Sequence, residues 1–315
     1  MTTTIQTITL RSSQHFGRRV PSKALGHLLE ILPDTVRQSV RMAVEGRSRA
    51  KGKRPDWLRA AGDIRFLGHE GEDDTVLHFE APILGDAAPR LYEQQELWPA
   101  KPAPEDSGFD ILADVLLDVA ARNVESERFD RQLLDQIYNL RHVLNGTFHE
   151  MALTGCRHSA EQPVVVTPSV VEIARNLYAN TPLPRQARIA GQLDMLRGST
   201  QSFAVLLDDG QEIRGVLKEG DIERLGPLLN RRVLVLGTAV YRPSGKLLRV
   251  DAEEVTLASG RQDFFSTIPR PAWKQFDLQD TVREQRHKMG IAAVIGKWPG
   301  EESDEQIEQS LKELS

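Results

Sequence analysis

The sequence predicts an α+β protein with a small β-barrel and a C-terminal segment that binds a partner. Strand-like alternation and helix-like spacing of apolar residues are mixed over positions 1–180. After the prolines of "ANTPLPRQ" the pattern changes to dense β-alternation, and the chain ends in a short acidic amphipathic stretch. We therefore expect an N-terminal α+β domain at 1–180, a small barrel at 185–258, a connector with a helix at 259–294 and a partner-binding tail at 295–315.

In the first part of the α+β domain, the sequence predicts a strand, a helix and a second strand. Ile8 and Leu10 alternate with polar residues, as in a strand. Ser22 is a possible cap for the helix that follows. The apolar face of this helix carries four leucines, Leu25, Leu28, Leu29 and Leu32. Alternation then predicts a further strand around Val40, Met42 and Val44.

A hairpin, three helices and two further strands complete this domain. The stretch "DIRFLGHEGEDDTVLHFEA" alternates on both sides of a polar turn, which predicts two paired strands. The Pro-rich loop "WPAKPAPEDSG" precedes two helices, and Gly146 ends the second of them. The stretches "TFHEMALTG" and "QPVVVTP" predict two more strands, and Pro168 suits the start of the helix "SVVEIARNLY".

Five short strands are predicted in the barrel, at 187–196, 202–208, 212–218, 232–241 and 246–256. The glycines of "DDGQ" and "RPSGK" suit hairpin turns. One short helix, "GDIERLGPLLN", is predicted between the third and fourth strands. This element order is that of an OB-like barrel, and an SH3-like barrel is the alternative.

Composition places the chain among globular, cytoplasmic proteins of bacterial style. It has 315 residues, of which 40% are hydrophobic, and its net charge of −5 argues against coating nucleic acid by bulk charge. The single cysteine, Cys156, cannot form an internal disulfide, which fits a reducing compartment. The N-terminus lacks a signal-peptide pattern, and no apolar run approaches the roughly 20 residues that span a bilayer.

The tail "IGKWPGEESDEQIEQSLKELS" has the features of a short helix that folds on a surface. Ser303 and Gln306 form a capping box after a turn at Pro299 and Gly300. A helix of about 12 residues is marginal in water by itself, so it needs the body of the protein or a partner to fold upon. Three apolar residues share one face of this otherwise polar helix, Ile307, Leu311 and Leu314.

The string "GKWPGEESDEQIEQSLKELS" resembles the toxin-binding tails of antitoxins that neutralise PIN-domain ribonucleases. In such tails a G-x-W-x-G-(D/E)-(E/D) turn precedes an acidic amphipathic helix. The resemblance implies a toxin–antitoxin system in which Trp298 anchors the turn and Lys297 approaches the metal-binding carboxylates of the partner. It further implies that the helix fills a groove of the nuclease with Ile307, Leu311 and Leu314. Such antitoxins are usually short, whereas here a long α+β and barrel body precedes the tail.

Nucleic acid is the alternative partner, and in that case the tail only closes the fold of the protein. Five basic residues of "EGRSRAKGKRPDW" could neutralise several phosphates, Arg47, Arg49, Lys51, Lys53 and Arg54. The barrel offers Arg232, and Tyr241 beside Arg242, for the stacking and charge contacts that single strands need. Its other basic residues are Arg188, Arg197, Arg214, Arg231, Lys246 and Arg249. Acidic residues lie between them in the sequence. A solvated loop and a barrel that only packs are the simpler interpretations.

The sequence contains no motif that points to an enzyme. It lacks the phosphate-loop, dinucleotide, nucleophile-elbow and zincin patterns. Cys156 and His158 are close together, but no second pair completes a zinc site. We therefore expect a non-enzymatic protein without a metal or cofactor.

Overall fold

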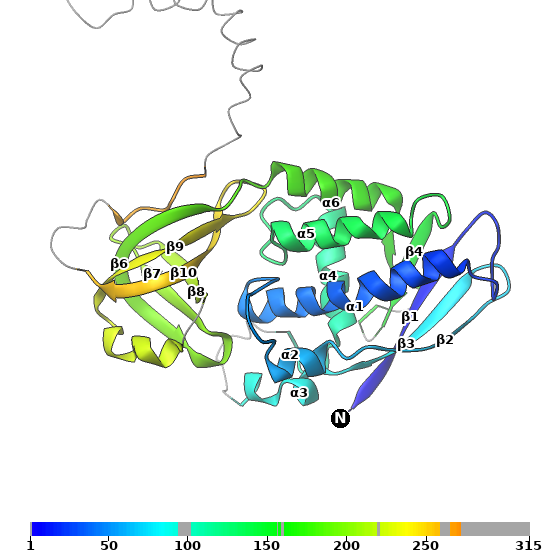
Figure 1. Cartoon of the computed structure of the whole chain (residues 1–315), viewed down its shortest axis with the longest axis horizontal. Helices are drawn as coiled ribbons and strands as arrows, with labels where there is room; N and C mark the ends of the chain where they lie inside the picture. Colours follow the sequence, from blue (N-terminus) through cyan, green and yellow to red (C-terminus); the bar gives the residue numbers. More distant parts are fainter. Residues whose placement is uncertain are drawn as a thin grey trace, which may run out of the picture. The chain divides into compact units, whose positions relative to one another are not determined.

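In the computed structural model, a sheet with its helices is followed along the chain by a β-barrel, and together they form the unit Met1–Pro271, called the compact unit below (Figure 1). The structure describes residues 2–93, 102–155, 157–158, 161–218, 221–258 and 265–271. The tail predicted at 295–315, most of the predicted connector and Cys156 lie outside the described residues. The helix predicted in the tail is therefore neither confirmed nor contradicted.

The N-terminal part contains a sheet of five antiparallel strands in the order β2-β3-β1-β4-β5. The strands are β1 (Thr3–Arg11), β2 (Arg65–Glu70), β3 (Thr75–Pro82), β4 (Glu150–Thr154) and β5 (Val164–Val166). Ile8 of the central strand lies opposite Leu77 on one side and Leu153 on the other, so the apolar residues share one face. The predicted first strand, the hairpin and the two later strands are confirmed.

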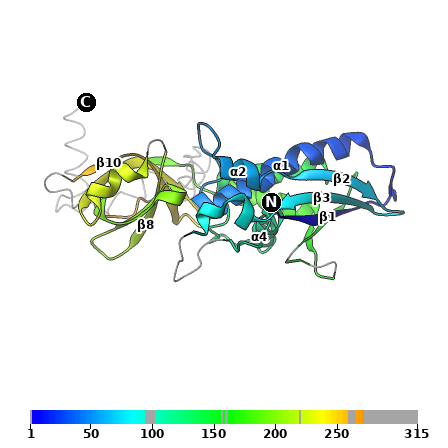
Figure 2. The same cartoon turned by 90° about the horizontal axis from the view of Figure 1, so that it is seen from below.

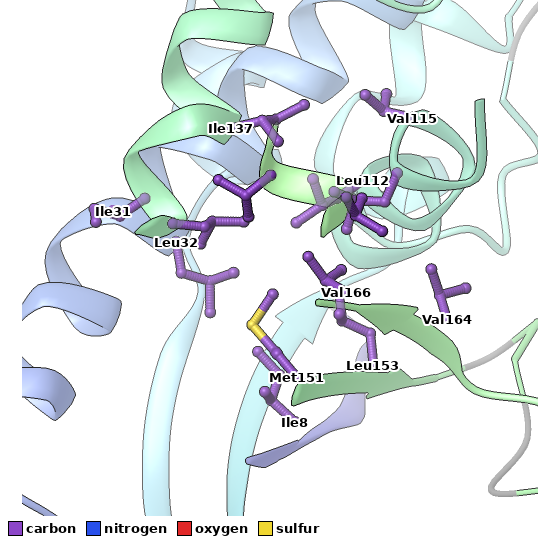
Figure 3. Packing of buried hydrophobic residues seen from close by; sticks show 14 of the residues in the cluster. Ile8, Ile31, Leu32, Leu112, Val115, Ile137, Met151, Leu153, Val164 and Val166 are labelled. Carbon is purple, nitrogen blue, oxygen red and sulfur yellow. The ribbon is translucent and has the colours of Figure 1, made fainter. Parts of the chain in front are cut away.

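Four longer helices contribute to the core that this face buries. They are α1 (Ser22–Glu45), α4 (Gly108–Ala120), α5 (Arg131–Tyr138) and α6 (Pro168–Asn180). Figure 2 shows α1 lying along β1, β2 and β3. Figure 3 shows Ile8, Met151 and Val166 of the strands facing Leu32 and Leu112 of the helices, and all five residues are buried. The shorter helices of this part are α2 (Asp56–Ala61), α3 (Leu84–Ala87), η1 (Pro89–Leu91) and η2 (Asn139–His142).

The helix α1 runs past Pro33, so the strand predicted around Val40, Met42 and Val44 is wrong. The same stretch also fits a helix, because Val36, Val40 and Val44 are spaced by four residues. All three valines are buried. This packing offsets the cost of a proline inside a helix, which is about 3 kcal/mol. At the start of α1, Pro21 rather than Ser22 occupies the N-cap position.

The C-terminal part of the unit is a closed five-stranded barrel. Its strands are β6 (Arg185–Arg197), β7 (Ser202–Leu206), β8 (Glu212–Leu217), β9 (Arg232–Tyr241) and β10 (Leu247–Leu257). The order is β10-β8-β7-β6-β9, and β9 pairs with β10 to close the ring. The pair β8–β10 is parallel, and the other four pairs are antiparallel. The five predicted strands are confirmed, and the predicted helix between the third and fourth is the 3-10 helix η4 (Ile222–Leu228). A second 3-10 turn, η3 (Gly198–Thr200), joins β6 to β7.

The barrel interior is filled by alternate side chains of its strands, which form a second buried cluster. Phe203 is the largest of them, and it lies across from Gly215 of β8. A Cβ atom at position 215 would come within 2.2 Å of the Phe203 ring. Glycine at this position therefore makes room for the phenylalanine. The preceding residue, Arg214, faces outward because Ile213 points inward.

Candidate functional site

The basic loop that the sequence assigns to phosphate contact begins inside the protein. Arg47 is 8% exposed. Its Nε donates to a carboxylate oxygen of Glu45 at 2.9 Å, and its Nη1 donates to the carbonyl of Leu217 in β8, also at 2.9 Å. Arg49 is exposed and donates to the side chains of Gln38 in α1 and Gln136 in α5. Arg47 therefore ties the end of α1 to the barrel and has few donors left for a phosphate, whereas Arg49 contacts the helices and stays accessible.

The other three basic residues of the loop, Lys51, Lys53 and Arg54, are exposed. Lys51 lines a cleft of about 640 Å³, together with Arg47, Arg49 and Lys218. The acidic residues Asp251 and Glu253 line the same cleft. The loop thus brings positive charge to the barrel surface, but this charge is partly balanced there.

The three barrel residues assigned to nucleic acid already have partners within the protein. Arg232 makes two hydrogen bonds to the carboxylate of Asp208, at 2.6 and 2.8 Å. Tyr241 is completely buried, so its ring has no face free for a base. Arg242 donates to the Glu127 carboxylate at 2.6 Å and to the carbonyl of Glu125 at 2.9 Å.

A buried ion pair joins the barrel to the helices. A guanidinium nitrogen of Arg249 in β10 lies 3.1 Å from the carboxylate of Asp130, the N-cap of α5, and both side chains are at most 5% exposed. Ser48 and the backbone N–H of Leu133 also donate to this carboxylate. Burial by itself would raise the pKa of Asp130. The positive charge of Arg249 and the three donated hydrogen bonds outweigh it, so the pKa is lowered.

The described residues that precede the tail dock on the barrel. The backbone N–H of Asp208 donates to the hydroxyl of Ser266 at 2.9 Å. The carbonyl of Arg270 accepts hydrogen bonds from Arg185 at 3.0 Å and from the Tyr241 hydroxyl at 3.3 Å. The buried tyrosine therefore holds the chain at the point where the compact unit ends.

A cleft of about 890 Å³ lies beside this docked segment. The end of β6, the strand β8, the β9–β10 turn and residues 267–271 all contribute to its walls. Five basic residues line it, Arg197, Arg214, Arg242, Lys246 and Arg270. Three acidic residues line it as well, Glu127, Asp209 and Glu212. The excess of positive charge favours an anionic ligand.

Arg214 is a partly buried charged residue of this cleft. Its guanidinium is half-buried and lies over Gly46, where an added Cβ would come within 2.7 Å of the guanidinium carbon. Burial lowers the pKa of Arg214, the charge of Glu127 opposes this, and Arg197 and Arg249 lower the pKa further. Within the described part of the chain, its guanidinium makes neither a hydrogen bond nor an ion pair. No sequence pattern distinguishes this arginine from the other arginines of the barrel.

The described residues also bear on metal binding and on membrane insertion. No group of three or more histidine, cysteine, aspartate or glutamate side chains in them is arranged to hold a metal ion. Likewise, none of the helices in this part of the chain has the length and apolar character needed to cross a membrane. Comparison with known proteins yields no matching family model, curated protein or solved structure.

Proposed function

We propose that this chain is an antitoxin-like, non-enzymatic protein of the cytoplasm whose tail binds and inhibits a PIN-domain nuclease. The observation that carries the proposal is the sequence of the tail. Trp298 lies in a turn before a capped, acidic helix whose apolar stripe holds Ile307, Leu311 and Leu314. Tryptophan is enriched at the centre of protein interfaces, and an amphipathic helix in a groove is a common mode of peptide recognition.

The fold of the body supports the assignment of partner binding to the tail. Its buried clusters, as far as they are described, draw on residues between Ile8 and Ile268. The docked segment then brings the chain to Pro271, where the compact unit ends. A body that forms a unit of its own up to Pro271 is compatible with a tail that binds a partner.

The test is inhibition of the nuclease that co-purifies with the full chain from its native host. We expect the double variant Trp298→Ala/Leu311→Ala to lose the partner and to release ribonuclease activity that added full chain suppresses. Gln309→Ala, on the polar side of the predicted helix, is the matched control and should retain both properties. If deletion of 298–315 left the partner bound and lowered the melting temperature of the body by many degrees, the tail would instead be part of the fold.

We propose nucleic-acid binding by the body as a second function, because the barrel has the element order of an OB-like fold. The strands β6 to β10 close in the order 1-2-3-5-4, with the third and fifth strands parallel and η4 between the third and fourth. OB-like barrels bind single strands on the face of their second and third strands and on adjacent loops. Binding should weaken steeply with salt, and an affinity for oligonucleotides that does not change with salt would contradict this function.

A further inference from the structure

We propose that the 890 Å³ cleft around Arg214 binds the phosphodiester backbone of single-stranded nucleic acid. This inference rests on the second proposed function. It places the main contact on Arg214, with Arg197 on the same face of the barrel, rather than on Arg232 and Tyr241. Arg242 lines the cleft but is already paired with Glu127.

The first argument concerns the charge of Arg214. Removing a guanidinium from water is costly unless an anion or hydrogen-bond acceptors replace the lost solvent. The equally basic Arg249 has such replacements in Asp130 and Asp251. Arg214 is half-buried, and among the described residues its interaction with acidic groups is the longer-range attraction to Glu127. A phosphate oxygen in the cleft would supply the acceptor that the guanidinium lacks.

The second argument concerns the neighbouring strands. Met195 of β6 pairs with Ala204 of β7, which pairs with Arg214 of β8. Arg197 lies two residues beyond Met195, so it faces the same side of the barrel wall as Arg214. Neighbouring strands lie about 4.8 Å apart, which separates the β6 and β8 backbones by roughly 10 Å. Two arginines on one surface at this spacing can contact an extended phosphate backbone at more than one point.

The walls of the cleft indicate what kind of strand would fit. Its lining residues include aliphatic side chains such as Met195, Leu247 and Ile268, but no phenylalanine, tyrosine or tryptophan among those described. Recognition would therefore depend on phosphates, with guanidinium planes as stacking surfaces, and would vary little with base sequence. The volume is that of a site for a small ligand or a few nucleotides, and this favours a single strand over a duplex.

The experiment is fluorescence anisotropy of the full chain with labelled oligo(dT) and oligo(rU). We expect Arg214→Ala to weaken binding about tenfold and to reduce the slope of log affinity against log salt by about 0.7, the value for one lost phosphate contact on a single strand. Arg188→Ala is the matched control, because Arg188 is an exposed arginine of the same barrel outside the cleft. It should leave the affinity within about twofold. Arg214→Lys, which keeps the charge, should retain intermediate affinity and serves as the test if Arg214→Ala does not fold.

The outcomes separate the site from the function. If Arg214→Ala binds like wild type while Lys51→Ala/Lys53→Ala loses affinity, the site is wrong and nucleic-acid binding by the body stands. If the wild-type chain binds neither oligonucleotide, both are overturned. Unlabelled mononucleotide and inorganic phosphate serve as competitors. Competition by either at the concentration at which the oligonucleotide competes would show a site for a free phosphate group and contradict strand binding.

Discussion

Among the ion pairs that join the barrel to the helical part, two have nearly the same length but opposite exposure. Arg249 lies 3.1 Å from Asp130, and Lys246 lies 3.0 Å from Glu125. The side chains of the first pair are 5% and 2% exposed, whereas those of the second are 71% and 43% exposed. Both contacts link the same two regions of the chain, so the comparison isolates the effect of solvent.

The difference teaches that distance alone does not measure what an ion pair contributes. Exposed pairs are screened by water and salt and contribute little to stability. A buried pair also gains little over apolar residues of the same shape, but removal of one partner leaves an uncompensated charge away from water. The buried contact should therefore be the one whose loss the protein does not tolerate.

The largest expected effect follows from Asp130→Ala. This change leaves Arg249 without its main counter-charge and removes the acceptor for Ser48 and Leu133. We expect the free energy of unfolding to fall by about 3–5 kcal/mol, as measured by urea denaturation. The double variant Asp130→Ala/Arg249→Met should recover part of this loss, because it no longer buries an unpaired charge. Equal stability of wild type and Asp130→Ala would mean that the contact is solvated.

A smaller effect is expected from acid. The pKa of Asp130 is lower in the folded protein than its unfolded value of about 3.9. The stabilisation is therefore fully present above the unfolded value and is lost as pH falls through the folded value. Unfolding free energies measured from pH 7 downward should fall more steeply for wild type than for Asp130→Asn below about pH 4. Parallel curves for the two proteins would contradict the assignment.

The smallest effect is expected at the exposed contact. Lys246→Ala removes the 3.0 Å pair with Glu125, but Arg242 still holds the same loop through Glu127 and the Glu125 carbonyl. We expect no change in the urea midpoint beyond experimental error, at low salt or in 0.5 M NaCl. A loss close to that of Asp130→Ala would show that exposure is not the property that distinguishes the contacts.

Much of the fold could be predicted because it depends on local patterns. Alternation together with glycines such as Gly210 and Gly245 located the barrel strands, and both glycines have positive φ, as tight turns require. The continuation of α1 could not be seen, because Pro33 is a local signal for a helix end and the burial that overrides it is a property of the whole fold. Val40, Met42 and Val44 fit the alternation of a strand, and the two valines also fit the four-residue spacing of a helix.

The candidate site was much less predictable than the fold. A run of basic residues does not show which of them will be buried: Arg47 is buried, whereas Lys51, four residues later, is exposed. Arg249 and Arg214 both look like ordinary outward residues of strands. One meets Asp130 from a distant part of the chain, and the other lies over Gly46 at the end of α1. Such long-range pairings do not leave a periodic trace in the sequence.

The position of β10 in the chain sets an order of assembly during synthesis. This last strand closes the barrel by pairing with β8 and β9, and it also carries Arg249 to Asp130. Until the ribosome has released Leu257, the barrel lacks its closing strand and Asp130 lacks its counter-charge. Trp298 lies 41 residues beyond Leu257, so at about 5–20 residues per second it follows Leu257 by about 2–8 seconds. The body can thus complete its fold before Trp298 emerges, so a nascent chain need not expose its partner-binding segment on an unfinished body.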